Sequence, residues 1–115
     1  MVLLCPVQSW TPIGTTMQFT KITTHVLKTP LGKERFYSSQ AAFPERTSLL
    51  VRLETDTGLV GWGEGGQYGP PEPVAACIHA VLGSQVLGSD PRNPAVLWEQ
   101  LYSMIRDFGQ KGPLP

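Results

Sequence analysis

Alternating apolar and polar positions predict a β-hairpin in the middle of the chain. Residues 47–55 carry apolar side chains at every second position, which is the period of a strand with one buried face. The apolar positions are Leu49, Val51 and Leu53. A turn at Asp56-Thr57-Gly58 leads into a second run over 59–64. A short turn of this kind joins neighbouring strands, so the two runs are expected to pair antiparallel.

A further strand is predicted over residues 19–28, which are rich in threonine, valine and isoleucine. Simple alternation puts Phe19 and Leu27 on one face of this strand and Ile22 and Val26 on the other. The three strands follow one another along the chain and are expected to form a three-stranded antiparallel meander.

Helical periodicity replaces alternation after the third strand. Over 73–87, apolar residues fall at the i, i+3, i+4, i+7 spacing of one helix face. Those residues are Val74, Cys77, Ile78, Val81 and Leu82. Pro73 suits the first helical turn and Gly88 the C′ position. Gly83 costs about 1 kcal/mol relative to alanine inside a helix, which favours an earlier end.

A second helix is predicted to begin with Asn93 as N-cap and Pro94 at the first helical position. Its apolar stripe is expected to pack on the first helix and the sheet. The stripe contains Leu97, Leu101, Met104, Ile105 and Phe108. The order β-β-β-α-α predicts an α+β fold, a three-stranded antiparallel meander followed by a helical part.

The chain of 115 residues is long enough for one domain. Residues 1–16 are uncharged and show no clear period, so they are expected to be an unstructured extension, with Met17 as the natural start. The apolar beginning lacks a basic region and is interrupted by Pro6, unlike an export signal. We therefore expect a cytoplasmic protein.

Charge and metal-ligand spacing narrow the function classes. Nine basic and nine acidic residues cancel, without a run of like charge, so neither nucleic acid nor a membrane surface is an expected partner. His25 and His79 lack metal-ligand spacing. Cys5 and Cys77 do not suggest a disulfide framework, and Cys77 reads as a small buried hydrophobe. No catalytic or metal-binding residue is predicted.

Glycines at Gly61, Gly63 and Gly66 match G-x-G-x-x-G, a pattern of dinucleotide-binding turns. Such a turn needs a parallel strand that enters a helix at once. Here a hairpin precedes the glycines, prolines follow them, and Glu64 would put a carboxylate inside the phosphate site. The pattern is therefore interpreted as strand and loop glycines.

Residues 31–46 form a long connection between the first two strands, without a clean helical or strand period. Connections of this length in compact domains are usually functional or disordered. Phe36, Tyr37 and Phe43 favour a lid or binding loop. The alternative is that these rings cover the domain's own core.

Three segments, "DTGLVGWGE", "GSDPRNPAVLWEQLY" and "RDFGQKG", occur in an order that resembles the N-terminal capping domain of the mandelate racemase and muconate lactonizing enzyme group of the enolase superfamily. The resemblance covers 19–112 and implies a capping domain over 17–112. In that family two loops of this domain close the active site of a (β/α)-barrel. Carried onto this chain, they match 31–46 and 64–71. The implied substrate-binding residues are Phe36, Tyr37, Phe43, Gln67 and Tyr68.

The family's chemistry is proton abstraction beside a carboxylate, with Mg²⁺ and the base supplied by the barrel. A barrel takes about 250 residues, and here residues 113–115 form only a tail. The resemblance therefore implies a lid fragment, inactive alone, whose partners are the missing barrel and a carboxylate sugar. The alternative is a stand-alone binding or dimerisation module of the same fold. A homo-oligomer is compatible with either.

Overall fold

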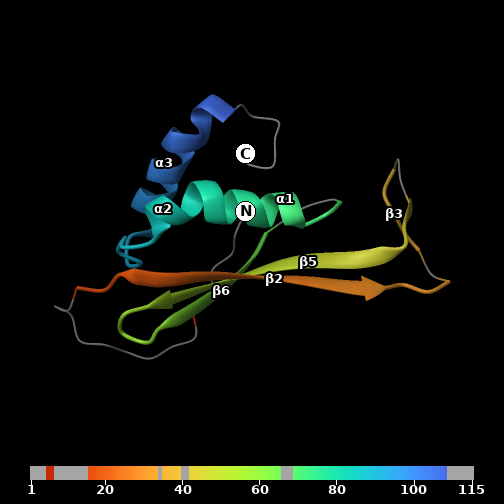
Figure 1. The fold of residues 1–115 in the computed structure, drawn as a ribbon, viewed down its shortest axis with the longest axis horizontal. Coiled ribbons are helices and arrows are strands. Elements are labelled where there is room, and N and C mark those ends of the chain that lie inside the picture. Colours follow the sequence, from red (N-terminus) through yellow and green to blue (C-terminus); the bar gives the residue numbers. More distant parts are fainter. Residues whose placement is uncertain (1–4, 7–15, 34, 40–41, 66–68, 109–115) are drawn as a thin grey trace.

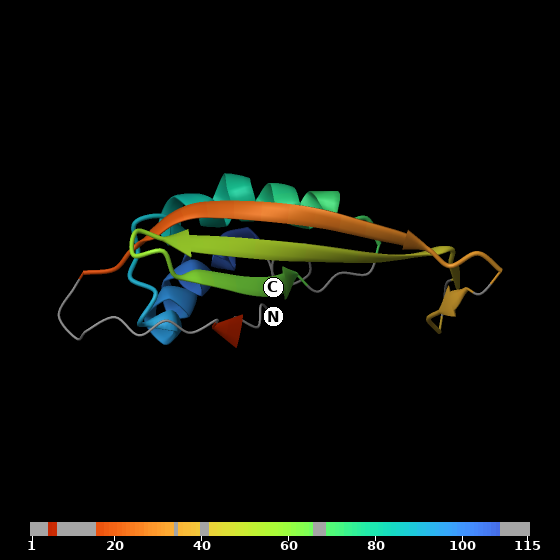
Figure 2. The same cartoon turned by 90° about the horizontal axis from the view of Figure 1, so that it is seen from below.

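A computed structural model describes residues 5–6, 16–33, 35–39, 42–65 and 69–108. Helices cover one face of an antiparallel sheet, which gives the α+β fold predicted from the sequence (Figures 1 and 2). The strands are β1 (Cys5–Pro6), β2 (Phe19–Pro30), β3 (Phe36–Tyr37), β4 (Ala42–Phe43), β5 (Glu45–Thr55) and β6 (Val60–Gly65). The helical elements are α1 (Glu72–Cys77), the π-helical turn η1 (Ile78–Leu82), α2 (Gly83–Val86), α3 (Pro94–Ile105) and the 3-10 turn η2 (Arg106–Phe108).

The main sheet has the strand order β1-β6-β5-β2, with every neighbouring pair antiparallel. The predicted meander of β2, β5 and β6 is confirmed. Its tight turn relies on Gly58, whose φ of 84° lies in the left-handed region that glycine adopts without strain. The backbone N–H of Thr55 donates to the carbonyl oxygen of Leu59 across this turn, at 2.9 Å.

A β-bulge near the start of β2 reverses the predicted facing of Phe19. The register shifts between Phe19 and Lys21, so that Phe19 lies opposite Thr55 while Ile22 lies opposite Leu53. One inserted residue moves the chain before it to the other face of the sheet. Phe19 therefore joins Ile22 in the core, and the prediction that it shares a face with Leu27 is wrong.

The first predicted helix is continuous from Glu72 to Val86 through α1, η1 and α2. It does not end at Gly83, which is buried inside it. A Cβ atom at Gly83 would lie 3.3 Å from the carbonyl oxygen of Ile78, so glycine allows the close backbone approach of the π-helical turn. Gly88 follows at C′ with a φ of 84°, as predicted.

Helix α3 begins as predicted, with Asn93 at the N-cap and Pro94 at the first position. Leu97 and Leu101 pack against a buried cluster of Phe19, Leu53 and Val86, which joins this helix to the sheet and to α2. Phe108 was expected on the same buried stripe, but 65% of its surface is exposed. The reason is that η2 tightens to three residues per turn, which rotates residues 106–108 out of the phase of α3.

Strand β1 lies within the segment that was expected to be an unstructured extension. Cys5 and Pro6 pair antiparallel with Trp62 and Gly61 of β6. The expectation therefore does not hold at these two residues. The pairing occupies part of the β6 edge, whose backbone groups would otherwise need another partner. Residues 1–4 and 7–15 lie outside the described part of the chain.

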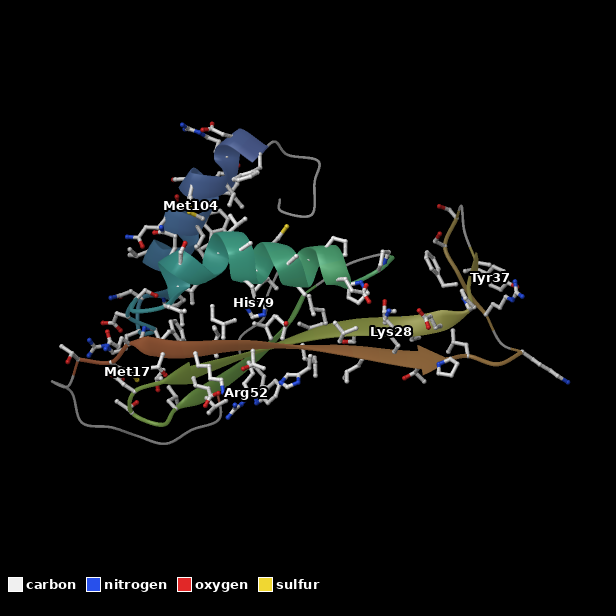
Figure 3. The ribbon with its side chains drawn as sticks, viewed as in Figure 1. Met17, Lys28, Tyr37, Arg52, His79 and Met104 are labelled. Atoms are coloured by element: carbon white, nitrogen blue, oxygen red, sulfur yellow. The ribbon has the colours of Figure 1, made fainter. Side chains whose placement is uncertain are left out.

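The core lies between the sheet and the helices, and no described helix covers the other face of the sheet, which we call the open face. A second buried cluster of Leu49, Val51 and Ile78 fills the space under α1 and η1. Figure 3 shows His79 on the helical side of the sheet and Arg52 on the open side. Because the helices cover only part of the long β2–β5 ladder, one end of the sheet projects beyond them (Figure 1).

Candidate functional site

The first predicted substrate loop leaves the sheet at its projecting end, and the second leaves in the same direction from β6, which stops under α1. The first loop, residues 31–46, connects the end of β2 to the start of β5, where Pro30 lies opposite Glu45. The second loop, residues 64–71, begins at the end of β6, where Gly65 lies opposite Leu49 of β5. Figure 1 shows β3 beyond this end, turned toward the side of the sheet that carries the helices.

The first loop is more regular than its sequence suggested. The backbone N–H of Leu31 donates to the carbonyl oxygen of Pro44 at 3.0 Å and closes its base. Farther out, β3 and β4 form a small antiparallel ladder in which Phe36 lies opposite Phe43 and Tyr37 opposite Ala42. The signal that could have revealed this hairpin is the aromatic pair, because such cross-strand pairs stabilise short ladders.

Tyr37 is a predicted site residue of the first loop whose side chain is exposed. Of its surface, 68% is open to solvent, and Figure 3 shows it at the opposite end of the molecule from Met17. Phe43 is half-buried. For Phe36 the structure describes the backbone pairing. The exposure of Tyr37 argues against the alternative in which this ring covers the domain's own core.

Two cationic residues of the first loop were not among the predicted site residues. Lys33 and Arg35 are both exposed. Arg35 precedes Tyr37 by two positions, and residues two apart on an extended chain point to the same side. The sequence signal that could have pointed to Arg35 is its spacing from Tyr37, with one residue between them in the long connection.

The second loop is fixed at both ends, although Gln67 and Tyr68 lie outside the described residues. At its start, the Ser48 hydroxyl donates a hydrogen bond to the carboxylate of Glu64. Near its end, the hydroxyl of Thr47 donates to the carbonyl oxygen of Gly69 at 3.4 Å. Both partners belong to β5, so this strand anchors the second loop and also carries the base of the first.

An ion pair ties the beginning of α1 to the projecting end of the sheet. Lys28 Nζ of β2 lies 2.7 Å from Glu72 Oε1. The hydrogen bond between them raises the pKa of Lys28 and lowers the pKa of Glu72, so both groups stay charged over a wide pH range. Both side chains are solvent-exposed, and the pair therefore orients the helix more than it stabilises the fold.

The described residues do not offer a site for a divalent cation. Among them, no group of three or more histidine, cysteine, aspartate or glutamate side chains is close enough to hold a metal ion. Mg²⁺ prefers several oxygen ligands in octahedral geometry, and the isolated carboxylates here do not supply them.

None of the described helices has the length and apolar character that crossing a membrane requires.

The G-x-G-x-x-G pattern begins in β6, and its two described glycines, Gly61 and Gly63, do not form a nucleotide-binding turn. Gly61 and Gly63 lie inside a strand that pairs antiparallel with β5. A dinucleotide turn instead joins a parallel strand directly to a helix N-terminus. Gly65 is small for a packing reason, because a Cβ atom there would lie 3.2 Å from Leu49 Cδ2.

Comparison with known proteins gives the chain relatives along most of its length. It is 41% identical over 96 residues to D-galactarolactone cycloisomerase from Agrobacterium fabrum, which covers 84% of this chain and 24% of that enzyme. It is 36% identical over 66 residues to D-galactonate dehydratase from Klebsiella pneumoniae, covering 57% of this chain and 16% of the enzyme. The chain thus spans about a quarter or less of the length of these curated relatives.

Solved structures and a family sequence model agree with this. A member of the enolase superfamily from Agrobacterium tumefaciens superposes with a TM-score of 0.70 at 27% identity, covering 85% of this chain and 30% of that one. A second member, from Roseovarius nubinhibens ISM, gives 0.64 at 28% identity, covering 77% and 25%. The model of the mandelate racemase/muconate lactonizing enzyme N-terminal domain matches residues 21–108. The chain belongs to the mandelate racemase/muconate lactonizing enzyme family, and its described fold is that family's N-terminal domain.

Proposed function

We propose that this domain is the substrate-capping lid of a mandelate racemase-type enzyme and closes over an active site that the following domain carries. The observation that carries the proposal is the exposed hairpin β3–β4, which holds Tyr37 beyond the end of the sheet. A side chain this exposed gains little from its own domain. It is available to cover a ligand when a second domain lies beneath it.

The substrate class of the proposal is a sugar acid. Two relatives are named for reactions of D-galactarolactone and D-galactonate, and the latter carries a carboxylate. Arg35 and Lys33 would bring positive charge to the same hairpin as Tyr37. A guanidinium group pairs well with a carboxylate because it can donate two parallel hydrogen bonds. The second loop would contribute Gln67 and Tyr68, as the resemblance implies.

The chemical step is assigned to the following domain. Proton abstraction beside a carboxylate needs a positioned base and a group that stabilises the resulting negative charge. The described residues of this chain hold no candidate metal cluster. In this proposal the Mg²⁺ expected for the family and the base both belong to a (β/α)-barrel, and the 115-residue chain is inactive alone.

The test is a fusion protein in which residues 1–108 replace the matching N-terminal part of the Agrobacterium fabrum cycloisomerase. Tyr37→Ala, Arg35→Gln or Tyr68→Ala in the fusion should change the ratio of kcat/KM between two sugar acids, while proton exchange at the substrate α-carbon remains measurable. The matched control is Leu27→Ala, because Leu27 is half-exposed on β2 but lies outside both loops. If the loop variants shift the ratio no more than the control does, the lid assignment is wrong.

A further inference from the structure

Helix α3 has an unusual surface for a helix that is mostly exposed. Its twelve residues include one charged side chain, Glu99. A helix that faces water usually carries charged and polar residues along its outer side. Here that side keeps large apolar groups. Their exposed fractions are 56% for Val96, 59% for Trp98 and 37% for Tyr102.

Two of these residues form an ordered aromatic surface. The rings of Trp98 and Tyr102, one helical turn apart, are stacked with centroids 5.1 Å apart and planes 8° from parallel. We call this pair the α3 aromatic face. Stacking fixes both side chains before any partner arrives, which lowers the entropy cost of association. Tryptophan and tyrosine are also the side chains most often found at the energetic centres of interfaces.

The open face of the sheet contains an exposed tryptophan of a different kind. Trp62 is 38% exposed, but the His25 ring lies 5.6 Å from its ring and the Arg52 guanidinium 5.8 Å. Arg52 is in turn paired with Glu54, 2.5 Å away. Arg52 and Glu54 keep 31% and 26% of their side-chain surface exposed, so Trp62 already has polar neighbours in contact with solvent. The α3 aromatic face has greater exposed aromatic area and lies on a helix with a single charge.

The direction of the hairpin indicates which side of the molecule a following domain occupies. In Figure 1, β3 turns toward the helical side of the sheet, and α3 rises on that same side from its contact with α2. A lid that covers a neighbouring domain must have that domain on the side to which it turns. The relatives extend to roughly four times the matched length, and the matched part is their N-terminal domain.

We infer that the α3 aromatic face is the surface through which this domain docks on the domain that follows it in a full-length family member. The occupant is an apolar patch of that domain with an acceptor for the indole N–H of Trp98. The inference rests on the proposed function for the identity of the partner. The open sheet face, with Trp62, remains in water in the assembled enzyme.

Hydroxyl-radical footprinting read by mass spectrometry tests this inference, with Trp62 as the internal control. Oxidation rates of Trp98, Tyr102 and Trp62 are compared between the 115-residue chain and the fusion with the cycloisomerase. Oxidation of Trp98 and Tyr102 should fall several-fold in the fusion, whereas that of Trp62 should change little. Equal oxidation of Trp98 in both proteins, or protection of Trp62 in its place, would overturn the inference.

A second measurement uses the isolated chain and does not depend on the fusion. The fluorescence of a dye that binds exposed apolar surface should fall several-fold in the double variant Trp98→Gln/Tyr102→Gln and much less in Trp62→Gln. An equal or larger fall with Trp62→Gln would contradict the inference. Failure of the proposed function gives a different result: Trp98 is protected in the fusion, but Tyr37→Ala leaves the substrate ratio unchanged.

Discussion

At the scale of single residues, the environment of a side chain separates structural roles from candidate functional ones. Leu49 has no exposed surface and lies at the centre of the cluster under α1 and η1. Leu27 lies on the neighbouring strand, near the same end of the sheet, yet half of its surface is in water. Tyr37 is still more exposed. The first of these residues holds the fold, and the last is available to a ligand.

Replacing Leu49 should therefore be costly. Leu49→Ala is expected to lower the free energy of unfolding by about 2–5 kcal/mol, because it removes buried methyl groups and leaves a cavity between the sheet and α1. The matched control, Leu27→Ala, should change it by about 0.5 kcal/mol or less. Urea denaturation measures both. Similar losses for the two variants would show that the sheet is covered differently from this structure.

Asp90 should titrate at an unusually low pH. Hydrogen bonds from the Arg92 side chain, then from its backbone, lower the pKa of Asp90 from 3.8 to about 2. A depressed carboxyl pKa contributes stability that is present above pH 3.8 and is lost as the pH falls toward 2. An NMR titration of the Asp90 carboxyl should show the low midpoint, and Arg92→Gln should return it toward 3.8. An unchanged midpoint in that variant would contradict the assigned cause.

At the scale of elements, periodicity predicted the main strands and helices well, but it did not predict the local irregularities in β2 and at the end of α3. The β2–β5–β6 meander and the start of α3 follow from alternation, turn residues and capping residues. The bulge that turns Phe19 into the core could not be read from the sequence, since a one-residue register shift depends on pairing with β5. The exposure of Phe108 likewise depends on the local tightening at η2.

The candidate site was predictable to a similar degree. Aromatic residues in a long connection indicated a functional loop, and Tyr37 is indeed exposed in it. The β3–β4 ladder was not predicted, because a pairing of two residues on each strand leaves too short a pattern to recognise. That both loops leave the sheet in the same direction follows from strand directions in the sheet. Gln67 and Tyr68 stay predictions from the resemblance.

Trypsin should cut the first loop before it cuts the sheet. Lys33 and Arg35 are exposed and lie between β2 and β3. The β3–β4 ladder that follows them has only two residue pairs, so it gives them little protection. Lys28 and Arg52 lie within the long β2–β5 ladder, where cleavage requires the strands to separate. Mass spectrometry of early fragments should find cleavage after residue 33 or 35. Earlier cleavage after Arg52 would mean that the hairpin is better protected than the sheet.

At the scale of the whole molecule, the domain has a thin core and a large remaining surface. Seven hydrophobic residues are buried among those that the structure describes, and six of them form the two clusters between one sheet face and the helices. Nine large apolar or aromatic side chains in the same part of the chain stay exposed, and four of them lie on α3 and η2. This distribution is typical of a part that is completed by a neighbouring domain.

The isolated chain should accordingly be only marginally stable. A small core leaves few kcal/mol of net stability, so calorimetry is expected to show a broad transition at or below the usual range of about 45–65 °C for mesophilic domains. The fusion with the cycloisomerase should unfold more sharply and at a higher temperature. A sharp transition above that range from the monomeric isolated chain would count against a missing partner domain.

The central claim is that this chain supplies a lid and the domain that follows supplies the chemistry. Deuterium exchange at the α-carbon of a sugar acid, followed by NMR in heavy water, tests it most directly. The 115-residue chain with Mg²⁺ should give no exchange above a heat-treated control, whereas the fusion should catalyse exchange that EDTA abolishes. Exchange by the 115-residue chain alone, removed by EDTA, would show that this domain carries a complete active site and contradict the account.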